Sequence, residues 1–319
     1  MGETFRIEGP AVVSFSGGRT SAYMLRRILD AHGGRLPRDV RAVYANTGRE
    51  RAETLTFVRE CAERWGVEIA WIERDAEGYR ETDYERASRD GEPFAELIAE
   101  RRYLPNAVAR FCTSELKVLP IAAWARAQGF EAWRNVVGLR RDEARRVAKV
   151  LGRNATGEQE WESACPLYTA HVVRSEVMAF WSAQPFDLAL RSHEGNCDLC
   201  FLKGDRIRAR IVRERPDLAA WWIAQEQRIG GTFVSGDSYA APSTACAACR
   251  CSRWTSTRTK MPRGGHAHAR IERHCGGRAT EGDGRWVRST LPARLTERRR
   301  RTPRTADHAR SPGRRRTAG

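Results

Sequence analysis

The chain has 319 residues, with 56 Lys or Arg against 40 Asp or Glu, and a formal net charge of +16 at pH 7. Residues 241–319 hold 20 basic and 5 acidic residues, whereas residues 1–240 hold 36 and 35, so the overall charge does not mark the folded part as a nucleic-acid-binding protein. No apolar run is long enough to span a membrane and no signal-peptide pattern is present, so we expect a cytoplasmic protein without membrane contact.

The first predicted element is a buried strand over residues 11–15, followed by a glycine turn and a helix from about residue 19. Two adjacent glycines permit unusual backbone angles and let another group approach the backbone closely. The hydroxyl groups and the arginine around this helix N-terminus favour an anion, as do the free N–H groups and the helix dipole. We therefore predict a phosphate- or sulfate-binding loop formed by Ser16, Gly17, Gly18, Arg19, Thr20 and Ser21. A turn that merely needs glycine is the alternative.

Strand and helix signals alternate after this loop. Strands are predicted over residues 40–45, 67–72 and 133–139, and an amphipathic helix over residues 53–65. Such alternation is typical of an α/β fold in which a parallel twisted sheet carries helices on both faces. Ligands of these sheets bind beyond the carboxyl ends of the strands, where the second strand is followed by Asn46, Thr47 and Gly48.

The middle of the chain is less informative. Residues 73–109 are polar and predict a flexible insertion with a helix near residues 93–101. Ser114 is predicted to cap a helix that runs to about Gln128. Residues 152–163 are predicted to be a polar loop, and two further helices are expected over residues 172–181 and from Pro216 onward.

Basic residues follow the strand over residues 133–139. Guanidinium groups donate hydrogen bonds in a planar fork that matches phosphate and sulfate. The sequence therefore predicts an anion clamp made of Arg140, Arg141, Arg145 and Arg146, to which Lys117 adds a charge. A solvated charged surface is the alternative.

Four cysteines form a candidate metal site. Cys197 and Cys200 have the C-x2-C spacing that lets two thiolates bind one metal, and Cys112 and Cys165 are the natural remaining ligands. Four thiolates suit an iron–sulfur cluster or zinc. Reduced cysteines without a metal are the alternative.

Three segments resemble the phosphoadenosine phosphosulfate reductase family of the PP-loop superfamily. Residues 16–21 are similar to its SGGxDS pyrophosphate loop, with Thr20 in place of Asp. Residues 46–54 are similar to its DTGxxxxET segment, with Asn46 in place of Asp, and residues 138–146 resemble its GLRRxxSxxR stretch. The resemblance covers roughly residues 10–230.

The resemblance implies a PP-loop, Rossmann-like fold. Residues 1–150 would form the nucleotide-binding α/β domain and residues 151–240 a helical, cysteine-containing part that completes the site. The implied reaction is reduction of phosphoadenosine phosphosulfate with release of sulfite, using a thioredoxin-like reductant. Residues 16–21 would bind the anion and residues 46–48 the nucleoside, while Lys117, Arg140 and Arg141 would act as catalytic residues.

Two alternatives to sulfonucleotide reduction remain open. The first is ATP-dependent adenylation with Mg²⁺, which releases pyrophosphate and feeds sulfur transfer to a nucleic acid, as in DNA phosphorothioation or tRNA thiolation. The second is a non-catalytic, nucleotide-binding accessory protein. The sequence does not indicate an oligomeric state.

The resemblance also bears on the cysteines. Adenylylsulfate reductases hold a [4Fe-4S] cluster with a CC pair and a later CxxC, and Cys112, Cys197 and Cys200 stand in matching places. Phe111 replaces the other cysteine of the CC pair, so Cys165 would supply the fourth ligand. The nucleophilic cysteine of these reductases lies in a C-terminal ECGxH-like segment, which residues 273–276 resemble only superficially.

From about residue 241 the apolar periodicity ends and Arg, Pro, Thr, Ala and Gly predominate. A segment so poor in large apolar residues is predicted to be disordered, because it cannot bury enough surface to offset the entropy of ordering. A basic arm for nucleic acid, a neutral appendage and an out-of-frame translation product are the three interpretations of this segment.

Overall fold

The central element of the fold is a six-stranded sheet with the order β4-β3-β2-β1-β5-β6. The computed structural model describes residues 2–157 and 159–240. Within these residues, β4 (Arg80–Thr82) is antiparallel to its neighbour β3, and the other strands are parallel. These other strands are β1 (Ala11–Ser14), β2 (Val40–Asn46), β3 (Ile69–Glu73), β5 (Trp133–Val137) and β6 (Trp161–Ala164).

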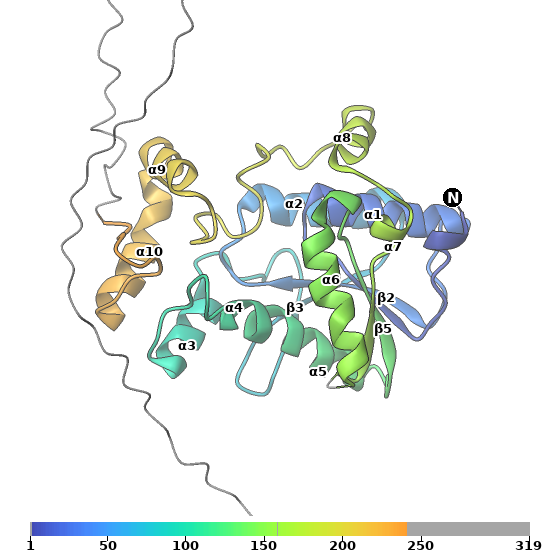
Figure 1. Cartoon of the computed structure of the whole chain (residues 1–319), viewed down its shortest axis with the longest axis horizontal. Helices are drawn as coiled ribbons and strands as arrows, with labels where there is room; N and C mark the ends of the chain where they lie inside the picture. Colours follow the sequence, from blue (N-terminus) through green and yellow to red (C-terminus); the bar gives the residue numbers. More distant parts are fainter. Residues whose placement is uncertain (1, 158, 241–319) are drawn as a thin grey trace, which may run out of the picture. The chain divides into compact units, whose positions relative to one another are not determined.

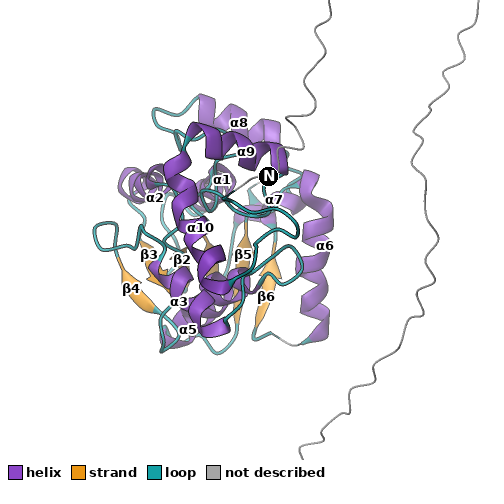
Figure 2. Ribbon diagram, turned by 90° about the vertical axis from the view of Figure 1, so that its left-hand side faces the viewer, coloured by secondary structure: helices purple, strands orange, loops and turns teal. Residues whose placement is uncertain are grey.

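Helices cover both faces of the sheet (Figures 1 and 2). On one face, Val13 and Ala42 pack with residues of α1 (Arg19–Ala31), α2 (Ala52–Trp65) and α8 (Arg174–Ser182). On the opposite face, Val12 and Val43 pack with α5 (Leu119–Ala127). Adjacent strand residues thus point to opposite faces, as the pleat requires. With both faces covered, the central strands β1 and β2 are mostly apolar rather than alternating.

A second apolar cluster forms beside the sheet. It joins α3 (Glu92–Arg101), α9 (Asp205–Glu214) and α10 (Pro216–Ile229) around the fully buried Trp222. Tyr239, near the end of the described residues, packs in the same cluster. Helices α9 and α10 fall within the predicted helical, cysteine-containing segment over residues 151–240, whereas α3 lies outside it.

The remaining elements are short connections, apart from one helix beside β6. This helix, α6 (Ala144–Gly152), contributes Val147 to a small apolar cluster. The short elements are η1 (Glu3–Phe5), α4 (Phe111–Thr113), η2 (Ser114–Val118), η3 (Arg141–Glu143), η4 (Arg153–Thr156) and α7 (Pro166–Thr169).

The predicted fold class is confirmed, but three local predictions are wrong. Ser114 does not cap a helix, because the helical segment already begins at Phe111 and Ser114 lies inside it. The helix predicted near residues 93–101 is present as α3, but residues 73–109 are not a loose insertion, since they also contain β4 and bury Phe94 and Leu97. The predicted loop over residues 152–163 includes the start of β6.

Two other expectations are neither confirmed nor contradicted. The predicted boundary at residue 150 stays a prediction, and the predicted disordered tail over residues 241–319 lies outside the described residues. In the described residues, no helix is long and apolar enough to cross a membrane.

Candidate functional site

The topology creates a crevice at the carboxyl ends of β1 and β5. The chain passes from β1 to β2 and β3 on one side, and β5 and β6 then add to the other side of β1. The connections that follow β1 and β5 therefore leave in opposite directions. Open α/β sheets bind ligands at such a switch point. Two cavities are found there, and both are lined by residues that follow these two strands.

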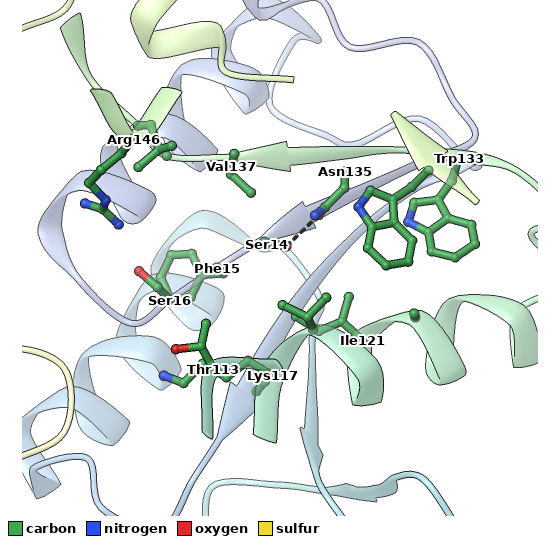
Figure 3. A pocket seen from close by; sticks show the side chains of 16 residues that line it. Ser14, Phe15, Ser16, Thr113, Lys117, Ile121, Trp133, Asn135, Val137 and Arg146 are labelled. Atoms are coloured by element: carbon green, nitrogen blue, oxygen red, sulfur yellow. Dashed lines mark hydrogen bonds between the residues drawn. The ribbon is translucent and has the colours of Figure 1, made fainter. Parts of the chain in front are cut away.

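The first cavity has a volume of about 280 Å³ and a mainly apolar lining (Figure 3). At one end lie Trp133 and Trp161, whose rings stack with centroids 5.4 Å apart. Ser16 and Arg146 lie at the other end (Figure 3). Apolar walls with a few polar groups at one end suit a flat heterocyclic ring carrying a charged substituent.

The predicted anion loop, residues 16–21, connects β1 to α1. Gly17 has φ +73°, and a Cβ atom there would lie 2.6 Å from the Thr54 methyl group, so glycine is required. The Ser21 hydroxyl accepts hydrogen bonds from Ser16 N (3.1 Å) and Ser16 Oγ (2.9 Å), and donates to the Gly18 carbonyl (2.9 Å). Ser21 therefore shapes the loop. No side chain caps α1, which leaves its first N–H groups available to an anion.

The second cavity has a volume of about 420 Å³ and a basic lining. It shares Ser16, Gly138 and Arg146 with the first cavity, so the two meet at the anion loop. The charged groups in its lining are one carboxylate, that of Glu143, and five guanidinium groups. The guanidinium groups belong to Arg19, Arg140, Arg146, Arg174 and Arg191. A ligand that fills both cavities would present an apolar ring to the first and an anion to the second.

The predicted basic residues are held in different ways. Arg140 donates to Thr20 Oγ1 (2.9 Å) and pairs with Asp142, so it links the anion loop to the end of β5. Arg19 donates to Asp187 Oδ1 (2.6 Å) and to the Leu190 carbonyl (2.9 Å). Carboxylates therefore already neutralise part of the charge that the sequence offers to an anion.

Two of the four predicted clamp arginines do not line the basic cavity. Arg141 lies over the Tyr168 ring, 4.8 Å from its centroid, and Arg145 is exposed on α6. Arg174 and Arg191 line the cavity in their place. Sequence reasoning missed both because each is a single arginine outside a basic run. The position of Arg174 at the start of a predicted helix was the available signal.

Residues 46–48 line neither of these two cavities. Asn46 is fully buried and donates from Nδ2 to Glu73 Oε1 (2.6 Å) and to the Ser88 carbonyl (2.8 Å). Gly48 has φ +75°, and a Cβ there would lie 2.9 Å from Gly91 Cα. This segment therefore joins the loop after β2 to the end of β3 and to the connection after β4. The predicted contact of residues 46–48 with a nucleoside stays a prediction.

Lys117 connects the first cavity to a buried polar cluster. It lines that cavity, and its Nζ lies 3.1 Å from Glu50 Oε1. The other oxygen, Glu50 Oε2, accepts hydrogen bonds from Thr47 N (2.9 Å) and Thr47 Oγ1 (2.7 Å). Burial alone would lower the pKa of Lys117, but the charge of Glu50 and the hydrogen bond to it raise this pKa above its ordinary value. Lys117 therefore stays protonated.

Three of the four predicted metal ligands gather near this cluster. Thr47 Oγ1 lies 3.8 Å from Cys197 Sγ. Burial and the neighbouring Cys200 raise the pKa of the Cys112 thiol; burial, Glu50 and Cys200 likewise raise that of Cys197. Cys165 lies apart in the apolar cluster with Leu139 and Val147, where burial raises the pKa of its thiol to about 11.

This arrangement does not fit the predicted four-thiolate metal site. Cys165 belongs to a different apolar cluster from Cys112 and Cys197. Among residues 2–157 and 159–240, no group of three or more His, Cys, Asp or Glu side chains is arranged to hold a metal ion. A cluster bound by all four cysteines would require the segment around Cys165 to move.

A buried ion pair fixes the C-x2-C turn to the loop after β2. Arg49 pairs with Asp198, and both side chains are at most 9% exposed. Asp198 N donates to the Arg49 carbonyl (2.8 Å), and Trp222 Nε1 donates to Asp198 Oδ1 (2.9 Å). The Arg49 guanidinium also lies 4.9 Å from the centre of the Trp221 ring. The turn is therefore anchored from two sides.

Comparison with known proteins identifies the family of the chain. Residues 10–180 match the phosphoadenosine phosphosulfate reductase domain, and the chain belongs to this family. Over 207 residues it is 30% identical to an uncharacterized nin region protein, ORF290, of Escherichia phage lambda. That match covers 60% of this chain and 66% of the phage protein, just under two thirds of its length.

The comparison with solved structures also matched the U34-tRNA thiolase NcsA from Methanococcus maripaludis with its [4Fe-4S] cluster. The sequence identity is 16% and the TM-score 0.35, over 69% of this chain and 68% of that one.

Proposed function

We propose that the protein is a sulfonucleotide reductase, which binds an adenine nucleotide carrying sulfate and releases sulfite from it. The observation that carries this proposal is the meeting of an apolar and a basic cavity at Ser16. Membership of the phosphoadenosine phosphosulfate reductase family supports an adenine nucleotide as the ligand.

The two cavities suggest how such a nucleotide would be oriented. The adenine ring would lie in the apolar cavity, against Trp133 and Val137. The 5′-phosphate would meet the free N–H groups at the start of α1, beside Ser16. The terminal sulfate would lie in the basic cavity, where Arg174 and Arg191 stabilise the negative charge that develops on the leaving phosphate.

The test uses the full chain, purified without oxygen. It receives phosphoadenosine phosphosulfate with a dithiol reductant and, separately, ATP with Mg²⁺; sulfite and pyrophosphate are assayed. Sulfite is the expected product. Pyrophosphate without sulfite would assign the protein to ATP-dependent adenylation instead, and binding without either product would assign it an accessory role.

A matched pair of arginine variants tests the basic cavity. Arg174→Gln removes a lining charge, whereas Arg213→Gln removes an exposed charge on α9 that lines neither of the two cavities. We expect Arg174→Gln to weaken nucleotide binding by about tenfold, as for the loss of a charged hydrogen bond, and Arg213→Gln to leave it unchanged. Equal effects would contradict the proposed orientation.

The [4Fe-4S] cluster stays a prediction from the family resemblance. If it exists, protein purified without oxygen contains four iron and four sulfide per chain, and Cys200→Ala lowers both contents. The separation of Cys165 from the other cysteines leads us to expect substoichiometric iron that Cys165→Ala does not change. Inductively coupled plasma analysis of the two variants checks this, and a full complement lost in Cys165→Ala would contradict it.

A further inference from the structure

A polar pair interrupts the apolar sheet face that lines the first cavity. Alternate residues of a strand point to the same face, so Val12 and Ser14 of β1 share this face with Trp133, Asn135 and Val137 of β5. The parallel register places Val12 beside Asn135 and Ser14 beside Val137. Ser14 and Asn135 are therefore diagonal neighbours, and both line the first cavity (Figure 3).

The amide of Asn135 is only partly satisfied within the protein. Ser14 Oγ donates to Asn135 Oδ1 at 2.7 Å. In the part of the chain that the structure describes, Asn135 Nδ2 donates to no other group, and surrounding atoms do not seal it off. Asparagine is disfavoured in strands, and a half-buried amide has lost hydrogen bonds to water. A ligand in the cavity can restore these hydrogen bonds.

Other polar side chains of the lining are engaged elsewhere. Lys117 pairs with Glu50, at 3.1 Å. Ser16 and Arg146 lie where the first cavity meets the basic one. The Asn135 amide lies between that end and the two tryptophans (Figure 3). It is thus a hydrogen-bonding group on the wall against which a heterocyclic ring would lie.

We propose that Asn135 selects adenine over guanine in the apolar cavity, and that Ser14 holds its amide in the orientation that this selection needs. The inference rests on the proposed function and deepens it, because it names the residue that would recognise the base. It concerns binding of the base and involves no step of the reaction.

The chemistry of the amide matches one edge of adenine. An asparagine side chain presents a donor beside an acceptor, and adenine presents an acceptor, N7, beside the donor of its 6-amino group. Asn135 Nδ2 would donate to N7, and the second lone pair of Oδ1 would accept from the amino group. Guanine has a carbonyl oxygen at this position, so two acceptors would face each other.

Ser14 determines which half of the amide does which task. Its hydroxyl occupies one lone pair of Asn135 Oδ1 and leaves the second one available. Rotation of the amide by half a turn, which would present the pattern suited to guanine, breaks this hydrogen bond. Ser14 is therefore a positioning residue, and its loss should weaken the preference for adenine without removing it.

The test measures base preference in binding, with the full chain and equilibrium dialysis. The probes are adenosine 3′,5′-bisphosphate and guanosine 3′,5′-bisphosphate, which carry the same anions and no sulfate to be released. We expect the wild type to bind the adenosine compound more tightly by about tenfold or more, as for one bidentate amide contact.

Three variants locate the source of this preference. Asn135→Leu removes both hydrogen-bonding groups and should bring the ratio of the two affinities close to one. Asn135→Asp keeps the shape but replaces the donor, so it should weaken binding of the adenosine compound by about tenfold or more. Ser14→Ala should give an intermediate ratio. Gln227→Leu, which removes an exposed amide on α10, is the control and should keep the wild-type ratio.

Binding of inorganic pyrophosphate shows whether a variant still has a folded anion loop, because this probe lacks a base. We expect all four variants to bind it as the wild type does. If Asn135→Leu fails this check, the isosteric Asn135→Asp and the smaller change Ser14→Ala decide the question. A preference for adenine that survives in Asn135→Asp, or a wild type that binds both compounds equally, would overturn the proposal.

The outcomes also separate this inference from the proposed function. Loss of the preference in the Asn135 variants, in a wild type that releases no sulfite, would support recognition of the base and overturn the reductase function. Sulfite release with no base preference would overturn the role of Asn135 and leave the reductase function standing. A wild type that binds neither compound would overturn both.

Discussion

Gly17 is under two separate constraints in the anion loop. Its φ of +73° disfavours any side chain, and a Cβ would also collide with Thr54. Gly33 has a similar φ of +69°, but a Cβ there would have nothing within 4 Å. The comparison of these two glycines separates backbone strain from steric collision.

We expect Gly33→Ala to lower stability by about 1–2 kcal/mol, because a residue with a Cβ atom is strained in the left-handed backbone conformation. Gly17→Ala should cost more and should also abolish nucleotide binding, because the loop must move away from α2. Chemical denaturation and equilibrium dialysis measure the two effects. Equal losses of stability with binding retained would show that the contact with Thr54 is unimportant.

Lys117 and Glu50 form a pair in which removal of one partner isolates the other. The Glu50 side chain is only 1% exposed. We expect Lys117→Met to destabilise the protein by about 3–5 kcal/mol, because it leaves a buried carboxylate without its cation. Adding Glu50→Gln should recover part of that loss. Urea unfolding of the single and double variants checks this, and additive losses would contradict the coupling.

Residue-level predictions can be made from the sequence where a pattern is local. The anion loop of residues 16–21 has its signal within six consecutive residues, and both cavities are found beside it. The orientation of Asn46 had no such signal, because its partner Glu73 lies 27 residues away. The separation of Cys165 from the other cysteines likewise depends on tertiary packing that spacing does not encode.

At the scale of elements, the segment between α8 and the C-x2-C turn depends on a carboxylate. Glu194 accepts hydrogen bonds from Arg191 N (2.8 Å) and Arg191 Nη2 (2.9 Å), and these lower its pKa to about 2. A lowered pKa contributes stability at pH values above the unfolded pKa of about 4.3, and this stability is lost as the pH falls toward 2.

We therefore expect thermal stability to fall between about pH 4.5 and 2, with a smaller fall in Glu194→Gln than in the wild type. Glu63→Gln is the control, because its side chain is 67% exposed. Melting temperatures measured across this range test the prediction. Parallel curves for wild type and Glu194→Gln would contradict it.

Helix α2 and strand β2 followed from the sequence, whereas the short strands β4 and β6 did not. Helix α2 has an apolar face of four residues at helical spacing, which identifies it within one window. Strands β4 and β6 have three and four residues, and their strand conformation depends on β3 and β5 as partners. Too few residues remain in such strands to establish a period of two.

For the whole molecule, alternating strands and helices were enough to predict the class of fold, because each unit carries its own apolar pattern. They could not predict the contact between Arg49 and Asp198, which are 149 residues apart. This contact brings the second apolar cluster, around Trp222, against the loop after β2. The position of the C-x2-C turn therefore depends on this ion pair.

We expect Asp198→Asn to destabilise the protein by about 3–5 kcal/mol, because Arg49 is left buried without a counter-charge. Asp205→Asn removes a carboxylate that is 80% exposed and should change stability by less than about 1 kcal/mol. Denaturation, together with the rate at which a thiol reagent labels Cys197, measures both effects. Unchanged labelling in Asp198→Asn would show that the turn is held by other contacts.

The ion pair between Arg49 and Asp198 can form only late in the synthesis of the chain. The ribosome makes Arg49 early, but Asp198 follows 149 residues later and Trp222 another 24 residues after that. The sheet can assemble while this late segment is still being synthesised. During that interval Cys197 lacks its burial and its contact with Thr47, so its thiol is exposed to cellular oxidants. Newly made chains should therefore be more sensitive to oxidation than mature ones.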